Sequence, residues 1–216
     1  MTKKLITVVL LLVAIPMLIR AVDYRAIEVD VTMHPANYRA LLDRFIAADT
    51  TLTAQEMETV YYGYTFTPSY EPRDSFPEIH AAYEREDFEE VVRLVEPALE
   101  QNPMSLDLSI MAWAVYERGI GPTPGAKALK MAIRSDLIAN TILKSGLGTS
   151  VASPFYVISA SDRHRILNNV IGIGAVLGTD RIGDVEAVKF IFKGNSRQHI
   201  LYFDNTLEEK FLKTHR

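Results

Sequence analysis

The segment from Ser159 to His164 contains the residue types of a serine hydrolase. Ser159 or Ser161 could supply the nucleophile, His164 the general base, and Asp162 the carboxylate that orients the base. A nucleophilic serine of this kind usually sits on a Gly-x-Ser-x-Gly turn, which is missing here, and side chains adjacent in sequence rarely converge on one point. We therefore interpret Asp162 as the N-cap of a short helix that reaches Ile171, and we expect no catalysis at this segment.

A second segment, from Gly172 to Gly178, has the glycine spacing of a dinucleotide-binding fingerprint. That fingerprint needs a strand before the glycines and a long helix after them, because the helix N-terminus holds the pyrophosphate. Here Thr179, Asp180 and Gly183 follow, and then a predicted strand. We predict a glycine-rich apolar connection and no nucleotide cofactor.

Thiol and metal chemistry have few candidate residues in this chain. It contains no cysteine, which excludes disulfides, thiolate zinc sites, iron–sulfur clusters and a lipidated N-terminal cysteine. The five histidines lack the paired spacing that is typical of a metal site. They are His34, His80, His164, His199 and His215. We expect neither a metal nor another cofactor.

The densest chemical feature is a run of aromatic side chains between positions 61 and 70. Its candidate binding residues are Tyr61, Tyr62, Tyr64, Phe66 and Tyr70. Aromatic rings on a loop can stack on sugars or grip a peptide, and phenol hydroxyls add hydrogen bonds. The same rings can instead pin an irregular loop onto the neighbouring helices. The sequence alone supports both interpretations.

Helical patterns fill the chain from Pro35 to about Gly146. Apolar residues recur at i, i+3, i+4 and i+7, which predicts helices with one buried face. Capping boxes at Thr53–Glu56 and at Ser75–Glu78 begin two of these helices, and Thr123 caps another. We predict six helices, mostly in antiparallel pairs.

One of these pairs, from Ala81 to Pro103, resembles a tetratricopeptide repeat. Small and aromatic residues occupy its first helix, Phe88 follows the turn, Ala98 comes ten residues later, and a proline closes the unit. Small residues let two helices approach, and aromatic rings fill the remaining space. A generic helical hairpin is the alternative interpretation.

After Gly146 the pattern changes to short apolar runs divided by glycine. The predicted strands are Phe155–Ile158, Ala187–Phe192 and His199–Phe203. Gly194-Asn195-Ser196 supplies the turn between the last two. We predict an α+β fold in which N-terminal antiparallel helical hairpins, TPR-like, in residues 22–146 pack with a small C-terminal antiparallel β-sheet in residues 147–216 as one compact unit.

Residues 1–21 differ from the rest of the chain and predict an export signal. Lys3 and Lys4 precede an apolar run from Leu5 to Ile19. Fifteen residues make about 22 Å of helix, which is shorter than the roughly 30 Å hydrocarbon core of a bilayer. The residues before the expected cleavage at Ala21 are poorly suited to signal peptidase, so an uncleaved N-terminal anchor is the alternative.

Composition excludes some partner classes. The chain is 48% hydrophobic and 23% charged, which excludes global disorder, and its net charge is −4. Residues 1–21 contain three basic residues and no acid, so the remainder carries −7. This charge repels phosphate backbones, and we expect no nucleic-acid partner. We predict a periplasmic or cell-surface protein that is not a lipoprotein and touches the membrane only through an uncleaved N-terminal segment.

Several motifs together resemble an exported family of Bacteroidetes catalogued as domain of unknown function 4919. The likeness starts near Tyr38 and continues to the C-terminus. Its motifs are Asp49–Thr53 with the following glutamate, Tyr61–Tyr64, Phe155–Ile158, Asp162–Leu167 and Leu201–Asp204. Family members commonly carry a Ser-Gly-Asp-Gly-like turn and an Asp-Glu-Tyr-like triplet, whereas this chain has Ser145-Gly146-Leu147-Gly148 and Asp162-Arg163-His164. The resemblance implies export, supplies no reaction, and makes a polar site at those positions doubtful here.

These observations favour a non-catalytic binding or scaffolding module of the cell envelope with a protein or envelope component as its partner. The alternative is a hydrolase that acts on an envelope polymer through paired carboxylates, one as general acid and one as general base or nucleophile. A third interpretation is a stabilising subunit of another protein.

Overall fold

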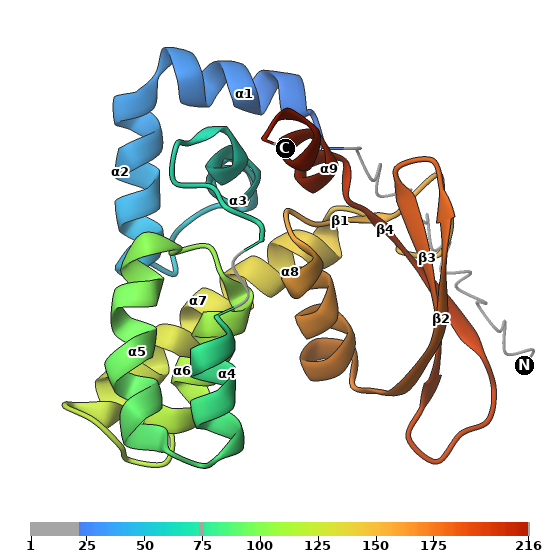
Figure 1. Cartoon of the computed structure of the whole chain (residues 1–216). Helices are drawn as coiled ribbons and strands as arrows, with labels where there is room; N and C mark the ends of the chain where they lie inside the picture. The colour runs from blue at the N-terminus through green and yellow to red at the C-terminus, as the bar shows by residue number, and fades with distance from the viewer. Residues whose placement is uncertain (1–21, 74–75, 216) are drawn as a thin grey trace, which may run out of the picture.

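Helices and one small sheet make up the chain (Figure 1). The computed structural model describes residues 22–73 and 76–215. The longer helices are α1 (Tyr24–Met33), α2 (Pro35–Ile46), α3 (Ala54–Gly63), α4 (Pro77–Glu84), α5 (Phe88–Gln101), α6 (Leu106–Tyr116), α7 (Pro124–Lys144) and α9 (Thr206–Thr214). Shorter helical segments are η1 (Tyr64–Phe66), α8 (Ala160–Arg165) and the π-helical η2 (Ile166–Ile171). The strands are β1 (Phe155–Tyr156), β2 (Ile173–Ile182), β3 (Val185–Phe192) and β4 (His199–Asp204).

The six helices that the sequence predicts correspond to α2 to α7, and α1, α8, η2 and α9 add to them. The capping box at the start of α3 is confirmed: Thr53 Oγ1 accepts the Glu56 N–H at 3.2 Å, and the Glu56 carboxylate accepts the Thr53 N–H at 2.7 Å. Ser75 lies outside the described residues. The N-cap of α4 is Phe76, which has a left-handed backbone.

Two hydrophobic cores share the helices α6 and α7. One core joins α1 to α3, the sheet and α9, while the other lies among α4, α5 and α6. Leu106 and Ile110 of α6 belong to the first core, whereas Leu108 and Met111 belong to the second. A helix that is apolar on all sides must be covered on all sides. The position of α6 is therefore set by both cores.

The sheet has the strand order β1-β4-β3-β2. Strands β2, β3 and β4 are antiparallel, and the hairpin turn between β3 and β4 contains Gly194 with a φ of 71°. Strand β1 pairs with β4 in parallel, with Phe155 opposite Phe203. The predicted α+β class is confirmed, with a mixed rather than wholly antiparallel sheet.

The glycine-rich segment that was predicted to be a connection is strand β2. It pairs with β3 along its length, with register irregularities between Ile173 and Ala175 and between Val176 and Gly178. A Cβ on Gly174 would lie 2.7 Å from the backbone nitrogen of Lys193, so glycine permits this close approach. The connection prediction was wrong because pairing with β3 outweighs the weak strand preference of glycine.

Helix α8 links the helices to the sheet (Figure 1). Its N-cap is Ser159, whose hydroxyl accepts the Asp162 N–H at 3.1 Å. The predicted N-cap, Asp162, instead lies in the first turn of α8 and is buried. That prediction was wrong because Asp162 takes its hydrogen bonds from other elements, as described below.

The predicted export signal, residues 1–21, lies outside the described residues. None of the helices within residues 22–73 and 76–215 combines the length and the apolar composition that crossing a bilayer requires.

Candidate functional site

Tyr61 and Tyr62 of α3 are completely buried and connect this helix to the segment that contains β1. The Tyr61 hydroxyl donates to Asp162 Oδ2 at 2.7 Å and accepts the Ile158 N–H at 3.3 Å. The Tyr62 hydroxyl donates to the carbonyl oxygen of Tyr156 at 3.1 Å. Burial raises the pKa of both phenols, so both remain protonated donors at neutral pH.

The other predicted aromatic residues also pack inside the molecule. The Tyr64 hydroxyl lies 3.0 Å from the carbonyl oxygen of Ser69 and 3.1 Å from that of Gln101. The Tyr70 hydroxyl donates to the carbonyl oxygen of Ile158. Phe66 is half-buried beside the first core. The placement of these rings matches the interpretation in which they pin an irregular segment onto the helices.

Asp162 is the buried acid at the centre of this tyrosine cluster. It is 2% exposed, and its carboxylate accepts from Tyr61 and, at 3.4 Å, from the Leu106 N–H at the start of α6. Burial raises the pKa of Asp162 to about 7. A cavity of about 20 Å³ adjoins it, lined in part by Tyr64 and Tyr70. That space holds about one water molecule and no polymer substrate.

A second buried acid, Asp107 in the first turn of α6, has charged partners. His80 Nε2 lies 2.8 Å from Asp107 Oδ2, and the Arg165 guanidinium pairs with Asp107 Oδ1. Arg165 Nη1 also donates to Asn169 Oδ1 at 3.2 Å. We name His80, Asp107 and Arg165 the Asp107 cluster.

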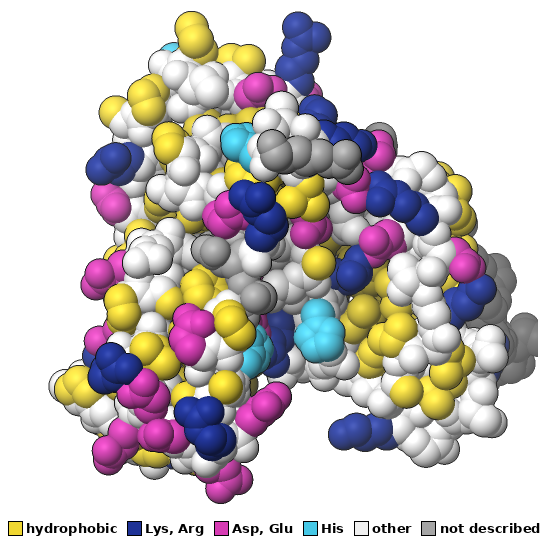
Figure 2. All heavy atoms as spheres, viewed as in Figure 1, with side chains coloured by type: hydrophobic (Ala, Val, Ile, Leu, Met, Phe, Trp, Pro, Cys, Tyr) yellow, Lys and Arg dark blue, Asp and Glu magenta, His cyan; other side chains and the backbone are white. Residues whose placement is uncertain are grey.

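Figure 2 shows a hollow between the helical part and the sheet, with histidine and basic side chains at its floor over α4 and α8. His164 lies on α8, and its Nε2 accepts from the Asn168 side-chain amide at 2.9 Å. Burial and the nearby Arg165 lower the pKa of His164, so its ring is neutral at neutral pH. The hollow is therefore lined in part by imidazole side chains whose Nε2 atoms bond to Asp107 and Asn168.

The residue types of a serine hydrolase are close in sequence but do not assemble. Ser159 caps α8, Asp162 takes the Tyr61 hydroxyl, and His164 takes the Asn168 amide. Arg163, between them, pairs with Glu186 of β3. Ser159, Asp162 and His164 therefore each have a different partner and do not form the hydrogen-bonded series of a catalytic triad.

The next question is whether the histidines, all of which the structure describes, gather with other metal-ligating side chains. Within residues 22–73 and 76–215, no group of three or more His, Cys, Asp or Glu side chains is placed to hold a metal ion. His199 stacks near Phe190 with ring centroids 5.6 Å apart, and His215 stacks on Phe211 at 4.1 Å.

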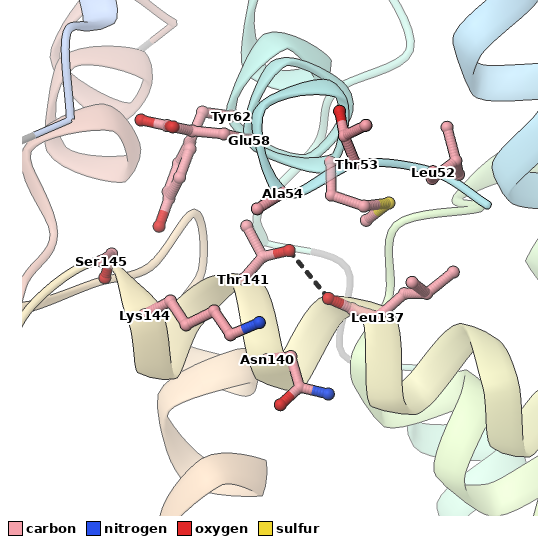
Figure 3. Close-up of a pocket in the computed structure, with 11 residues that line it drawn as sticks. Leu52, Thr53, Ala54, Glu58, Tyr62, Leu137, Asn140, Thr141, Lys144 and Ser145 are labelled. Carbon is pink, nitrogen blue, oxygen red and sulfur yellow. Dashed lines mark hydrogen bonds between the residues drawn. The ribbon is translucent and has the colours of Figure 1, made fainter. Parts of the chain in front are cut away.

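A pocket of about 270 Å³ lies between α3 and the C-terminal half of α7 (Figure 3). Glu58 and Tyr62 line it from α3, and Thr141 and Lys144 line it from α7. The Thr141 hydroxyl donates to the Leu137 carbonyl oxygen at 2.7 Å, the dashed line in Figure 3. The Glu58 carboxylate and the Lys144 ammonium group in its lining suit a small polar molecule.

A larger groove of about 680 Å³ runs between α2 and the segment that follows α3; we name it the α2 groove. Tyr64 and Phe66 are the predicted aromatic residues that line it. The apolar lining also includes Val31, Pro35, Ala36, Leu42, Ile46, Pro68 and Pro103. Its charged lining residues are Arg39, Asp43 and Glu100. An apolar groove with charges of both signs can accommodate a peptide segment.

The Asp107 cluster was missed in the sequence interpretation. Its three members lie at positions 80, 107 and 165, on three different helices. His80 and Asp107 are 27 residues apart, and Arg165 follows 58 residues later. No local motif joins them, so only the tertiary structure brings the three side chains together.

A family model described as domain of unknown function (DUF4919) matches residues 25–207. No curated protein and no solved structure matches the chain. The family match includes α2 to α8, the whole sheet, and both buried acids. Because it covers most of the chain, this protein belongs to the DUF4919 family.

Proposed function

We propose that this protein is a non-catalytic, exported binding module of the cell envelope and that the α2 groove receives an apolar peptide segment of a protein partner. The observation that carries the proposal is the groove itself. It brings together four parts of the chain, namely the end of α1, α2, the η1 segment and the end of α5. A peptide seated there would contact all four.

The chemistry of the groove supports a peptide rather than a sugar or a nucleic acid. Its lining combines prolines, aliphatic side chains and the half-buried Phe66. Apolar side chains of a bound peptide would be removed from water against these surfaces, which favours binding. Arg39 at one position and Asp43 one turn later provide charges that can set the direction of the bound segment. The acidic chain remains unsuited to phosphate backbones.

Export, the Bacteroidetes origin and the tetratricopeptide-like character of α4 and α5 form part of the same proposal. The basic and apolar residues 3–19 support export. The α4–α5 pair supports the repeat likeness, since Ala82 and Ala98 are buried and the rings of Tyr83 and Phe88 meet edge to face. Fractionation of cells that express the full chain tests export, which predicts recovery in the periplasm or at the cell surface.

The groove is tested with two substitutions on the same helix. Ala36 lines the groove and is exposed, so Ala36→Arg should fill the groove without disturbing a core. Ala40 is also exposed on α2 but does not line the groove, and Ala40→Arg is the matched control. Affinity purification from envelope extracts should recover the partner with the wild-type chain and with Ala40→Arg, and lose it with Ala36→Arg. Equal recovery with both variants would reject the groove.

The competing function is hydrolysis of an envelope polymer through Asp107 and Asp162. The observation in its favour is the raised pKa of Asp162, which is a property of general acids. Two observations weigh against it: Asp162 adjoins a cavity of only about 20 Å³, and Asp107 is held by two side chains. If envelope polymer is cleaved by the wild-type chain and not by a folded Asp162→Asn variant, the enzyme interpretation replaces ours.

A further inference from the structure

A cavity of about 500 Å³ lies between α6, α7 and the π-helical η2, and it shares no lining residue with the α2 groove. Its walls are mainly apolar, with Ile110 from α6, Ala139 from α7 and Val170 from η2. Cavities of roughly 300 to 1,000 Å³ with apolar walls and a few polar groups are typical of small-molecule sites. We name it the α6–α7 cavity.

A buried hydroxyl without a partner lines this cavity. Ser135 is 8% exposed, and its Oγ has no hydrogen-bond partner among the described residues. Buried hydroxyl groups are normally satisfied, because an unmade hydrogen bond in the interior is unfavourable. An occupant of the cavity with one donor or acceptor would satisfy Ser135.

The rim of the cavity contains both exposed apolar side chains and polar groups. Trp113 is 39% exposed and Val170 is 42% exposed, although both side chains are largely apolar. Trp113 Nε1 lies 3.3 Å from Glu117 Oε1, which holds the indole at the rim. Asp136 and Asn169 also line the cavity. The carboxylate of Asp136 and the net charge of −4 disfavour an anionic occupant.

The wall of the cavity formed by η2 has an unusual backbone conformation. Asn169 and Val170 belong to a six-residue π-helical segment. Isolated π-helical turns are rare and occur frequently at functional sites, where they direct side chains that a regular helix would place elsewhere. Asn169 additionally accepts from Arg165, so the wall is connected to the Asp107 cluster.

We propose that the α6–α7 cavity is a binding site for a small, uncharged amphipathic molecule, with its apolar body among α6, α7 and η2 and one hydrogen-bonding group on Ser135 Oγ. This site does not depend on the α2 groove or on a protein partner. It adds a small-molecule ligand to the binding module proposed above.

The single tryptophan of the chain, Trp113, reports directly on this cavity. The probe is N-phenyl-1-naphthylamine, which is uncharged and apolar and carries one N–H group. Titration of the full chain should give saturable energy transfer from Trp113 to the probe. The anionic dye 1-anilinonaphthalene-8-sulfonate should bind at least about tenfold more weakly, because of Asp136.

Three variants locate the probe. Ser135→Ala removes one hydrogen bond to the probe and should weaken binding about three- to tenfold, while the melting temperature of the protein without probe should stay the same or rise. Ala132→Leu adds volume inside the cavity and should abolish energy transfer. Ala126→Leu is the matched control on an exposed position of α7 outside the lining, and should bind like the wild-type chain.

Three results would overturn the proposal. The first is the absence of saturable energy transfer, and the second is equal transfer in Ala132→Leu and Ala126→Leu. The third is protection of Trp113 from acrylamide quenching that increases with protein concentration in the absence of probe, since this would show that a second copy covers the cavity. Circular dichroism and melting temperature verify that each variant is folded.

Discussion

Asp162 and Asp107 are both buried, and each lies in the first turn of a helix, yet they have different partners. Asp162 is contacted by uncharged donors, namely the Tyr61 hydroxyl and the Leu106 N–H. Asp107 is contacted by the Arg165 guanidinium and by His80. The nearby helix N-terminus, which favours negative charge, is common to both acids. What differs is the charge of the groups around each carboxylate.

This difference shows two ways in which the cost of burying a carboxylate can be balanced. With only neutral donors, burial dominates and raises the pKa of Asp162 to about 7, so a proton can balance the cost of burial. With a guanidinium in contact, a second charge can balance that cost at Asp107. Both acids connect α6 to other elements: Asp162 joins it to α3 and α8, and Asp107 joins it to α4 and α8.

The largest expected effect is at Arg165. The Arg165→Met substitution leaves Asp107, whose side chain is 5% exposed, without its guanidinium. Removal of one partner from a buried ion pair typically lowers the free energy of unfolding by about 3 to 5 kcal/mol. Urea denaturation at pH 7 measures this change.

The matching control for Arg165 removes both charges. Arg165→Met combined with Asp107→Leu should recover most of the lost free energy of unfolding, because no buried charge remains without a partner. A single Arg165→Met variant as stable as the wild-type chain would show that the Asp107 cluster does not hold α6 to α8.

The next effect depends on pH and concerns Asp162. Its pKa rises from 3.8 in the unfolded chain to about 7 in the folded chain, so the folded chain binds the proton more tightly. The stabilisation from this proton is complete below about pH 4 and is lost as the pH rises through 7. Asp162→Asn carries no such proton, so the free energy difference between wild type and variant should change by about 2 to 4 kcal/mol between pH 4 and pH 8.

Urea denaturation of both chains at several pH values measures this dependence. Relative to the wild-type chain, Asp162→Asn should be least stable at pH 4 and gain as the pH rises. A difference that stays constant across this range would mean that Asp162 is not the acid that titrates near neutrality.

Tyr61 and Tyr62 allow a comparison in which the expected changes in the free energy of unfolding are smaller. Tyr61→Phe removes the hydroxyl that donates to Asp162 and accepts from Ile158, which should lower the free energy of unfolding by about 1 to 3 kcal/mol. The loss should grow from pH 5 to pH 8, because the ionised form of Asp162 depends more on this donor. Tyr62→Phe, whose hydroxyl donates to a backbone carbonyl, should show a loss of about 1 kcal/mol without that growth. Equal pH profiles for the two variants would contradict the assignment.

The smallest expected effect is at His80. Its side chain is 38% exposed, and Asp107 keeps the Arg165 contact when the imidazole is removed. His80→Gln should therefore lower the free energy of unfolding by about 0.5 kcal/mol. His164→Gln is the control, since His164 bonds to Asn168 rather than to Asp107. Thermal unfolding measures the stability change of each of the two variants. A loss at His80 above about 3 kcal/mol would mean that His80 contributes as much as Arg165.

The sequence predicts the helical part well because its signals are local. Apolar spacing places α2 to α7, and the Thr53 capping box supplies a start for α3 that the hydrogen bonds confirm. The β3–β4 hairpin follows from β-branched and aromatic runs around Gly194. In each case the deciding interactions lie within a few residues.

The remaining features depend on contacts between distant segments. Glycines at positions 174 and 178 weaken the strand signal of β2, and only pairing with β3 makes it a strand. Aspartate is a preferred N-cap residue, but the carboxylate of Asp162 instead accepts a hydrogen bond from Tyr61, which is 101 residues away. The sequence identifies the aromatic residues at 61–70 as candidate binding residues. Their burial could not be predicted, because it depends on how α3 packs against the β1 segment.

The most direct test of the proposed binding function is photo-crosslinking in cells that express the full chain. The photoreactive amino acid p-benzoylphenylalanine is placed at position 39, which is exposed and lines the α2 groove, or at position 29, which is exposed on α1 outside the groove. We predict one dominant crosslinked protein from position 39 that is absent from position 29 and is lost when Ala36→Arg is added. Equal crosslinking from both positions, or none from position 39, would contradict the account.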